Sequence, residues 1–225
     1  MRIVIVGTGT NIGKTHLGVA LVTALARSGR EVCGLKPVES GVPAGELGPD
    51  ARALAAAGVF HVKQPQPYAL PEPVSPHLAA RHAGVTIELP PILDWLSTHA
   101  AQHLIIETAG GLLSPLAPSL TNLDLATAIA PTHWLLVAVD RLGVLHEVAA
   151  CMHILRTCCS PPVIPLVVLQ SPAEPDASTG TNASELVLLG IARQVLTMPR
   201  SAPDSPASER AAESILQALV SGPGL

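Results

Sequence analysis

The sequence predicts an α/β protein with a doubly wound, mostly parallel sheet and helices on both faces. Three observations predict this fold. Short β-branched runs alternate with alanine- and leucine-rich stretches along the chain. The β-branched runs are apolar throughout rather than at every second residue, which is typical of strands covered on both faces. The chain has 225 residues, of which 48% are hydrophobic and 13% charged, so we expect one domain over residues 1–225.

The strands are expected in six apolar runs, of which the last is the weakest: Ile3–Val6, Val32–Leu35, His103–Ile106, Trp134–Val139, Val163–Leu169 and Gln194–Thr197. The helices are expected between and after these runs: Lys14–Ser28, Asp50–Ala57, Pro91–Ala101, Asn122–Ala130, Gly143–Thr157 and Ser208–Val220. Three segments are expected to be irregular. Residues 65–76 contain five prolines and predict a rigid loop, Ser171–Ser184 predicts a mobile connection, and Ser201–Ser208 predicts a shorter one.

Composition excludes several classes of protein. A net charge of −4 with no basic tract argues against a nucleic-acid binder, and four aromatic residues offer little for base stacking. The most apolar stretch, Leu125–Val139, is too short for a membrane span and contains Pro131. The N-terminal apolar run is too short for a signal peptide, so we expect a cytoplasmic protein with no membrane partner. Its four cysteines are expected as buried thiols.

A phosphate-binding loop is the strongest motif. The first predicted strand runs directly into Gly7-Thr8-Gly9-Thr10-Asn11-Ile12-Gly13-Lys14-Thr15, and a predicted helix follows. The strict pattern G-x-x-x-x-G-K-[ST] would need glycine at position 8, but the strand–loop–helix context is kept. Lys14 would reach the phosphates, Thr15 would ligate Mg²⁺, and the helix N-terminus would face the anion. The alternative is a Gly/Thr-rich turn that only caps a helix. Phosphate binding favours a P-loop NTPase-like fold.

Charged residues follow two further predicted strands. Lys36 stands in C-G-L-K-P-V-E-S-G after the second, and Glu107 precedes Gly110-Gly111 after the third. The carboxyl ends of parallel strands meet at the ligand-binding edge of the sheet, beside the phosphate loop. There Lys36 could contact phosphates and Glu107 could hold Mg²⁺. The alternatives are a solvated surface cation for Lys36, a carboxylate satisfied by helix N–H groups for Glu107, and a plain N-cap for Asp50.

Five segments together resemble the dethiobiotin synthetase family of the P-loop NTPase superfamily: G-T-G-T-N-I-G-K-T (7–15), K-P-V-E-S-G (36–41), P-Y-A-L-P-E-P-V-S-P-H (67–77), I-E-T-A-G-G (106–111) and V-D-R-L-G (139–143). They cover roughly the first two thirds of the chain, in the family's order. The resemblance implies an ATP-dependent cyclo-ligase of biotin biosynthesis. Such an enzyme uses Mg²⁺ and ATP to carboxylate 7,8-diaminononanoate with CO₂ and close a cyclic urea.

The resemblance also implies roles for individual residues. Lys14, Lys36 and Ser40 would be catalytic, and Thr15, Asp50 and Glu107 would bind Mg²⁺. ATP would be bound by Asn11, Ile12, Gly13, Lys14, Thr15, His16, Asp50, Glu107, Thr108, Ala109, Gly110, Gln170, Pro199, Arg200 and Ser201. The diamine or its carbamate would be bound by Thr10, Lys36, Ser40, Gly110, Gly111, Gly143, Val144, Leu145 and His146. The last four would act across a homodimer interface. Gln170 aligns with an asparagine that reads the nucleobase in family members.

Two other functions remain possible at this point. A nucleotide-switched ATPase of the partitioning type shares the predicted fold, but it usually carries a lysine where this chain has Gly9. A cobyrinate-type amide ligase would need a glutaminase domain, for which 225 residues leave little room.

Overall fold

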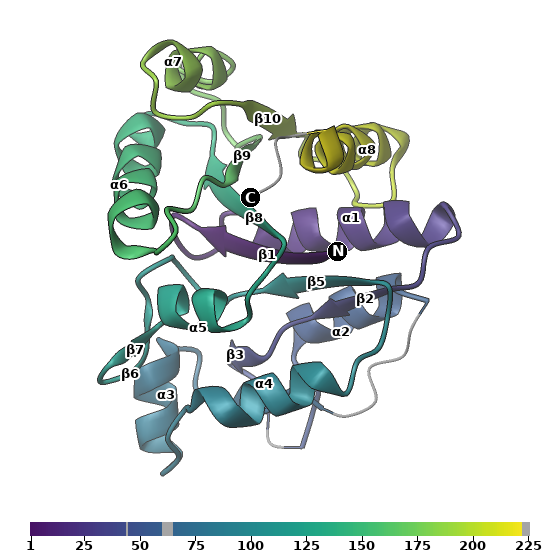
Figure 1. Cartoon of the computed structure of the whole chain (residues 1–225), viewed down its shortest axis with the longest axis vertical. Helices are drawn as coiled ribbons and strands as arrows, with labels where there is room; N and C mark the ends of the chain where they lie inside the picture. The colour runs from purple at the N-terminus through teal and green to yellow at the C-terminus, as the bar shows by residue number, and fades with distance from the viewer. Residues whose placement is uncertain (44, 60–64, 222–225) are drawn as a thin grey trace.

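The computed structural model describes residues 1–43, 45–59 and 65–221. Its centre is a six-stranded sheet in the order β10-β9-β8-β1-β5-β2, in which every pairing is parallel (Figure 1). The strands are β1 Arg2–Gly7, β2 Val32–Leu35, β5 His103–Glu107, β8 His133–Val139, β9 Leu166–Gln170 and β10 Val195–Met198. The chain winds outward from β1 in both directions. The predicted doubly wound α/β fold is therefore confirmed.

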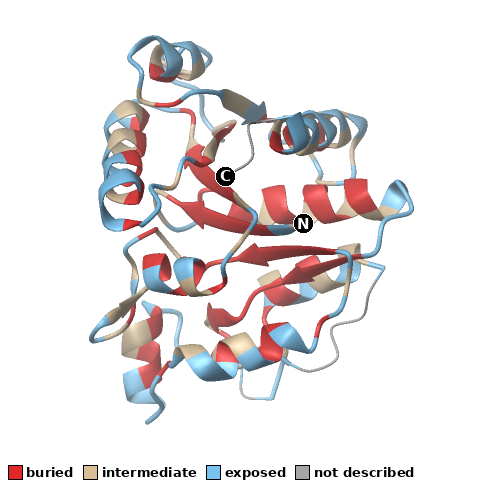
Figure 2. Ribbon diagram, in the orientation of Figure 1, coloured by how far each residue is buried: buried red, intermediate tan, exposed pale blue. Residues whose placement is uncertain are grey.

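Helices cover both faces of this sheet. They are α1 Lys14–Arg27, α2 Pro49–Ala57, α3 Pro76–His82, α4 Leu89–Ser97, α5 Asn122–Ala128, α6 Val144–Cys158, α7 Asn182–Leu188 and α8 Pro206–Ser221. One apolar cluster joins α1 and α8 to one face, and a second joins α4, α5 and α6 to the other. Figure 2 shows the sheet buried between helices whose outer surfaces are exposed. Burial on both faces explains why the strand sequences are apolar throughout.

Several predicted boundaries are wrong for identifiable reasons. The strand predicted from Val163 begins only at Leu166, because Pro165 has no N–H to give to the ladder. The helix predicted at Pro91–Ala101 is Leu89–Ser97, since prolines fit its first turn. The helix predicted to reach Ala130 ends at Ala128, and Ala130 has a φ of 49° that no helix can continue. The strand predicted at Val32–Leu35 is confirmed at both ends, and the other predicted elements differ by one or two residues at an end.

The segments predicted to be irregular contain short regular elements. Within residues 65–76, β4 Tyr68–Leu70 pairs in parallel with β3 Val38–Ser40, and Pro76 begins α3. The predicted mobile connection Ser171–Ser184 runs into α7, and Ser201–Ser208 runs into α8, which starts at Pro206. The strands β6 Pro115–Ala117 and β7 Leu120–Thr121 form a small antiparallel pair. Elements this short leave little periodicity in a sequence.

The four cysteines differ in burial. Cys33, Cys151 and Cys159 are buried thiols as predicted, but Cys158 is exposed at the end of α6. Burial raises the pKa of the Cys33 and Cys151 thiols to about 11, which keeps them unreactive. Within residues 1–43, 45–59 and 65–221, no helix combines the length and the apolar character needed to cross a bilayer.

Because α2 packs tightly on β2, we expect that replacing Gly34 by alanine destabilises the protein. A Cβ added at Gly34 would lie 2.7 Å from the backbone oxygen of Leu54, in the middle of α2. Gly34→Ala should therefore lower the free energy of unfolding by about 1–3 kcal/mol, although alanine normally suits a strand at least as well as glycine. Urea denaturation followed by circular dichroism measures this. Gly9→Ala is the control, because its Cβ would meet nothing closer than 3.7 Å.

Candidate active site

The loop between β1 and α1 lies at the carboxyl edge of the sheet and keeps an open helix N-terminus. Gly13 is the N-cap of α1 with a φ of 89°, and no side chain caps the first amides of this helix. Asn11 also has a positive φ, of 57°. The Lys14 ammonium spans the loop and donates to the carbonyl oxygen of Gly9 at 2.9 Å. Uncapped amides beside a lysine form a site for an anion, so the interpretation as a simple capping turn is wrong.

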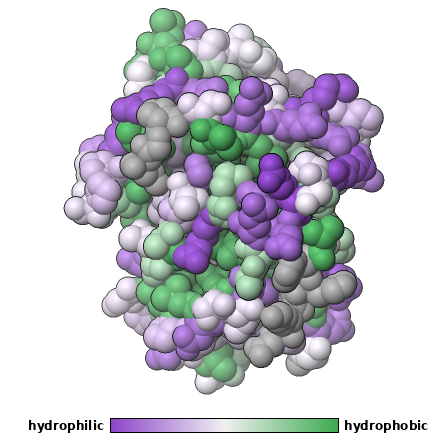
Figure 3. Space-filling view, turned by 45° about the vertical axis from the view of Figure 1, so that its right-hand side comes forward, coloured by the Kyte–Doolittle hydropathy of each residue, from purple (hydrophilic) through white to green (hydrophobic). Residues whose placement is uncertain are grey.

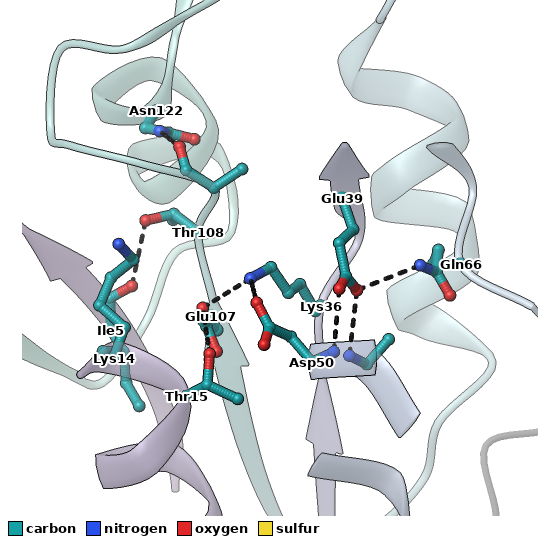
Figure 4. A network of polar contacts seen from close by, with 12 residues as sticks. Ile5, Lys14, Thr15, Lys36, Glu39, Asp50, Gln66, Glu107, Thr108 and Asn122 are labelled. Atoms are coloured by element: carbon teal, nitrogen blue, oxygen red, sulfur yellow. Dashed lines mark hydrogen bonds and ion pairs between the residues drawn. The ribbon is translucent and has the colours of Figure 1, made fainter. Parts of the chain in front are cut away.

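Next to this loop, Lys36 lies between two carboxylates (Figure 4). Its Nζ donates to Glu107 Oε1 at 2.7 Å and to Asp50 Oδ2, and the Thr15 hydroxyl donates to the same Glu107 oxygen at 3.0 Å. Lys36 follows β2, Glu107 ends β5, Asp50 lies in the first turn of α2, and Thr15 lies in the first turn of α1. Four separate elements thus bring together residues that the sequence placed in one site.

These contacts decide between the alternatives for each charged residue. Lys36 is 6% exposed, so it is no solvated surface cation. The N-cap of α2 is Gly48 rather than Asp50, and the Asp50 side chain contacts Lys36 instead. Glu107, 1% exposed, is bonded to side chains of Lys36 and Thr15 rather than to helix N–H groups. All three alternatives drawn from the sequence are therefore wrong.

The buried charges shift one another's protonation. Burial lowers the pKa of Lys14 to about 8, against the attraction of Glu107. Burial also acts to lower the pKa of Lys36, but the adjacent Glu107 and Asp50 carboxylates outweigh it and raise that pKa above the usual value. For Glu107, burial raises the pKa and Lys36 opposes the rise. Lys36 is therefore held as a charged ammonium in the site.

The donor set of this cluster fits Mg²⁺. Glu107 Oε2 is buried and has no hydrogen-bond partner, which leaves a carboxylate oxygen available to a cation. The Asp50 carboxylate and the Thr15 hydroxyl complete a set of hard oxygen ligands. In the part of the chain that the structure describes, no three His, Cys, Asp or Glu side chains converge on one point. Mg²⁺ needs no such cage, because it is usually held by one or two carboxylates together with phosphate and water oxygens.

A cavity of about 590 Å³ adjoins the phosphate loop on the side of β9. Its lining residues come from the loop and the start of α1, from β8 and β9, and from the segments after β9 and β10: Asn11, Ile12, Gly13, His16, Val139, Gln170, Ser171, Pro172, Ala173, Arg200, Ser201 and Ala202. Seven of these were predicted to bind nucleotide. Pro199 was predicted as well, but it is not among them, although its neighbours Arg200 and Ser201 are. The volume suits a drug-sized ligand such as a nucleoside.

Hydrogen bonds hold the cavity wall together. The Gln170 amide donates to the carbonyl of Gly13 at 3.1 Å, and its oxygen is 3.1 Å from His16 Nδ1. The other ring nitrogen of His16 is 2.7 Å from the carbonyl oxygen of Ser201. The phosphate loop, β9 and the segment after β10 are therefore joined around the cavity. No sequence pattern identified this side-chain role of His16.

Five of the residues expected at the substrate, Thr10, Lys36, Ser40, Gly110 and Gly111, belong to the loop itself or follow β2 and β5, on the other side of β1 from β9. Thr10 is exposed, and the buried hydroxyl of Ser40 has no hydrogen-bond partner, so it can still bond a ligand. Gly110 has a φ of 77°. The Asn122 amide donates to the carbonyls of Ala109 and Gly111 and so holds this turn to the start of α5. Asn122 was not predicted, because it lies at the start of a helix 11 residues beyond the turn it holds.

Thr108 has a structural contact. Its hydroxyl donates to the carbonyl of Ile5 at 3.1 Å and is therefore turned into the sheet. The Thr108 N–H donates to the same carbonyl, so both donors of this residue are already bonded, and a ligand contact by Thr108, Ala109 and Gly110 stays a prediction.

The start of α6 forms a separate group. Gly143 is the N-cap of α6 with a φ of 96°, and Val144 is fully buried with its amide bonded to Arg141. Leu145 and His146 follow in the first turn, where backbone N–H groups have no partner within the helix. Among the described residues, no hydrogen bond or ion pair joins these four to Lys36, Asp50 or Glu107. Val144 thus offers no free amide, contrary to the prediction.

Known proteins resemble the chain in sequence and in fold. Residues 1–198 match the AAA domain family AAA_26. The chain is 34% identical over 221 residues to the "ATP-dependent dethiobiotin synthetase BioD" of Anaeromyxobacter dehalogenans, covering 96% of this chain and 97% of that protein. It is 41% identical over 152 residues to the same-named protein of Ralstonia nicotianae, covering 64% and 66%. A ParA family ATPase from Chlorobium tepidum has a TM-score of 0.55 at 12% identity and covers 98% of this chain and 92% of its own, which shows the fold alone.

Proposed function

The chain belongs to the dethiobiotin synthetase family, and on this basis we propose that it converts 7,8-diaminononanoate and CO₂ into dethiobiotin with Mg-ATP. One observation supports this function above all: the buried Lys36 ammonium lies among Thr15, Asp50 and Glu107, beside the phosphate loop that carries Lys14. A fixed cation at this place can act on a phosphoryl group and on a carbamate at the same time.

The reaction has three steps. An amine of the substrate attacks CO₂ and loses a proton, which forms a carbamate. A carbamate oxygen attacks the γ-phosphorus of ATP, and ADP leaves. The neighbouring amine then attacks the carbamoyl carbon, the C–O bond to phosphate breaks, and the nitrogen loses a proton as the five-membered urea closes. Negative charge is concentrated on carbamate and phosphoryl oxygens throughout, so the enzyme must hold cations and amides at these oxygens.

The residues of this chain can meet that demand. Lys14 would bind the β- and γ-phosphates, and Lys36 would bridge the carbamate and the γ-phosphate. The Ser40 hydroxyl, which has no protein partner, would orient the diamine or its carbamate. Thr15, Asp50 and Glu107 would hold Mg²⁺, which neutralises charge on the phosphate oxygens when bound. The base would enter the cavity beside Gln170, where Arg200 and Ser201 lie.

A direct assay tests this function. The purified protein is incubated with diaminononanoate, bicarbonate, Mg²⁺ and each nucleoside triphosphate in turn, and both phosphate release and product mass are measured. We expect phosphate release that depends on the diamine, with one dethiobiotin formed per phosphate. Phosphate release that is indifferent to the diamine would instead indicate a nucleotide-switched ATPase.

The proposal includes a homodimer in which each site is completed by the partner. The amides of Leu145 and His146 at the positive end of α6 suit the distal carboxylate of a substrate bound to the other subunit. Leu145→Pro removes one of these N–H groups in the first turn, where an N–H has no partner within the helix, and it should raise KM for the diamine.

Mixing variants separates this arrangement from a site within one chain. Lys36→Met protein and Leu145→Pro protein, each with little activity at low diamine concentration, are exchanged into heterodimers. In each heterodimer, one site has both an intact Lys36 and an intact Leu145. About a quarter of the wild-type activity should return at low diamine concentration, if subunits assort randomly in a two-fold dimer. Absence of any recovery, with exchange verified by native mass spectrometry, would contradict the shared site.

A further inference from the structure

A further carboxylate, the buried Glu39, lies close to the cluster but outside it. Glu39 is on β3 and is 4% exposed. Its Oε1 accepts the backbone N–H of Asp50 at 2.9 Å, and its Oε2 accepts that of Ala51 at 3.0 Å. The Gln66 amide lies 3.4 Å from Oε2 on the other side (Figure 4). The K-P-V-E-S-G motif contains Glu39, but neither the reaction nor the sequence assigned it a role.

These contacts make Glu39 the cap of α2. The first amides of a helix need acceptors, and the N-cap of α2 is Gly48, which has no side chain to supply one. Glu39 supplies both oxygens from a different element, and its negative charge faces the positive end of the helix. The fit is close, because a Cβ added at Gly48 would lie 2.2 Å from Glu39 Oε2.

Capping by Glu39 determines where the Asp50 carboxylate lies. Asp50 is in the first turn of α2, so an anchored backbone N–H fixes its Cα relative to β3 and β2. From there its side chain reaches Lys36. Ser40 follows Glu39 on the same short strand, and adjacent strand residues point to opposite faces. The strand whose Glu39 caps α2 therefore presents the Ser40 hydroxyl on its other face.

We infer that Glu39 is a positioning residue for the divalent cation. It holds α2 so that the Asp50 carboxylate stays beside Glu107 and Thr15, in position to bind the metal together with the nucleotide. Because Glu39 has this effect only if Asp50 binds the cation, the inference rests on the proposed function.

The test measures metal binding directly. Mn²⁺ affinity is determined by electron paramagnetic resonance in the presence of a non-hydrolysable ATP analogue. Glu39→Gln keeps the size of the side chain but directs an NH₂ group toward a backbone N–H, so one cap bond is lost. We expect Mn²⁺ to bind about 10–100-fold more weakly, as for other residues that orient metal ligands. Affinity for the analogue without metal should change less than about twofold.

A second variant reaches the same carboxylate from the other side. Gly48→Ala is allowed by a φ of −60°, but its methyl group must displace Glu39 Oε2. It should weaken Mn²⁺ binding as Glu39→Gln does. The control for a general loss of stability is Ile215→Val, which shortens a fully buried side chain of α8, a different helix from the one that carries Asp50. It should leave Mn²⁺ affinity unchanged.

Asp50→Asn separates the role of Glu39 from the metal site itself. If Asp50→Asn weakens Mn²⁺ binding while Glu39→Gln and Gly48→Ala match the wild type, the role of Glu39 is overturned and the metal site stands. If Asp50→Asn itself has no effect, the metal ligation in the proposed function is wrong, and the inference about Glu39 falls with it.

Discussion

Replacing Lys36 by methionine should lower kcat for ring closure by about 10²–10³-fold, the usual cost of removing a fixed group that stabilises transition-state charge. Methionine preserves most of the aliphatic chain of lysine and removes only the ammonium. Nucleotide affinity should change less than tenfold, because the phosphate loop and the cavity beside Gln170 are untouched. Steady-state assays of dethiobiotin formation measure the first effect, and calorimetric titration with ADP measures the second.

Stability must be measured alongside, because Lys36 neutralises two carboxylates. Without it, the buried Glu107 loses its ion-pair partner, and breaking a buried pair in this way usually costs about 3–5 kcal/mol. Arg52→Met is the matched control, since it removes an exposed cation from the same helix that carries Asp50. Undiminished ring closure by a folded Lys36→Met protein would remove Lys36 from the mechanism.

The sequence was sufficient for the main architecture because the sheet is buried on both faces. Strands such as Ile3–Val6 and Val32–Leu35 are apolar without interruption, and this pattern can be read from the sequence without knowing which helices pack against them. The phosphate loop was equally visible, since its glycines and lysine must be contiguous in the chain. Short elements escaped prediction: β3 and β4 have three residues each and are stabilised by pairing across the chain rather than by local preference.

The parts of the site that could not be predicted depend on contacts between distant residues. Glu39 caps a helix that starts ten positions later, so no local capping pattern signals it. Asn122 and His16 likewise act on backbone carbonyls far from them in the chain. Even Lys36 was ambiguous on its own, because a lysine at the end of a strand is usually solvated. Its burial between Asp50 and Glu107 is a property of the fold.

Replacing Lys14 by methionine should have the other large effect, and it should differ in kind from that of Lys36. Lys14 directly follows the left-handed Gly13, and its ammonium crosses the loop to the carbonyl of Gly9, where phosphates would bind. Loss of a charge-assisted hydrogen bond of about 1.5–3 kcal/mol should weaken triphosphate binding by roughly 10–100-fold. Loss of charge stabilisation should also lower kcat by about 10²–10³-fold. Nucleotide affinity thus separates the two lysines.

Titration of Lys14 gives this prediction a second readout. Burial lowers its pKa to about 8, and the negative charge of a bound triphosphate would raise it. The ammonium is therefore already present below pH 8, where affinity should be constant. Above pH 8, the lysine must take up a proton on binding, so affinity should fall by up to about tenfold per pH unit. Calorimetry without Mg²⁺, in buffers of different ionisation enthalpy, measures this uptake. Proton uptake that persists unchanged in Lys14→Met would assign it to another group, whereas its disappearance would place the Lys14 ammonium on the phosphates.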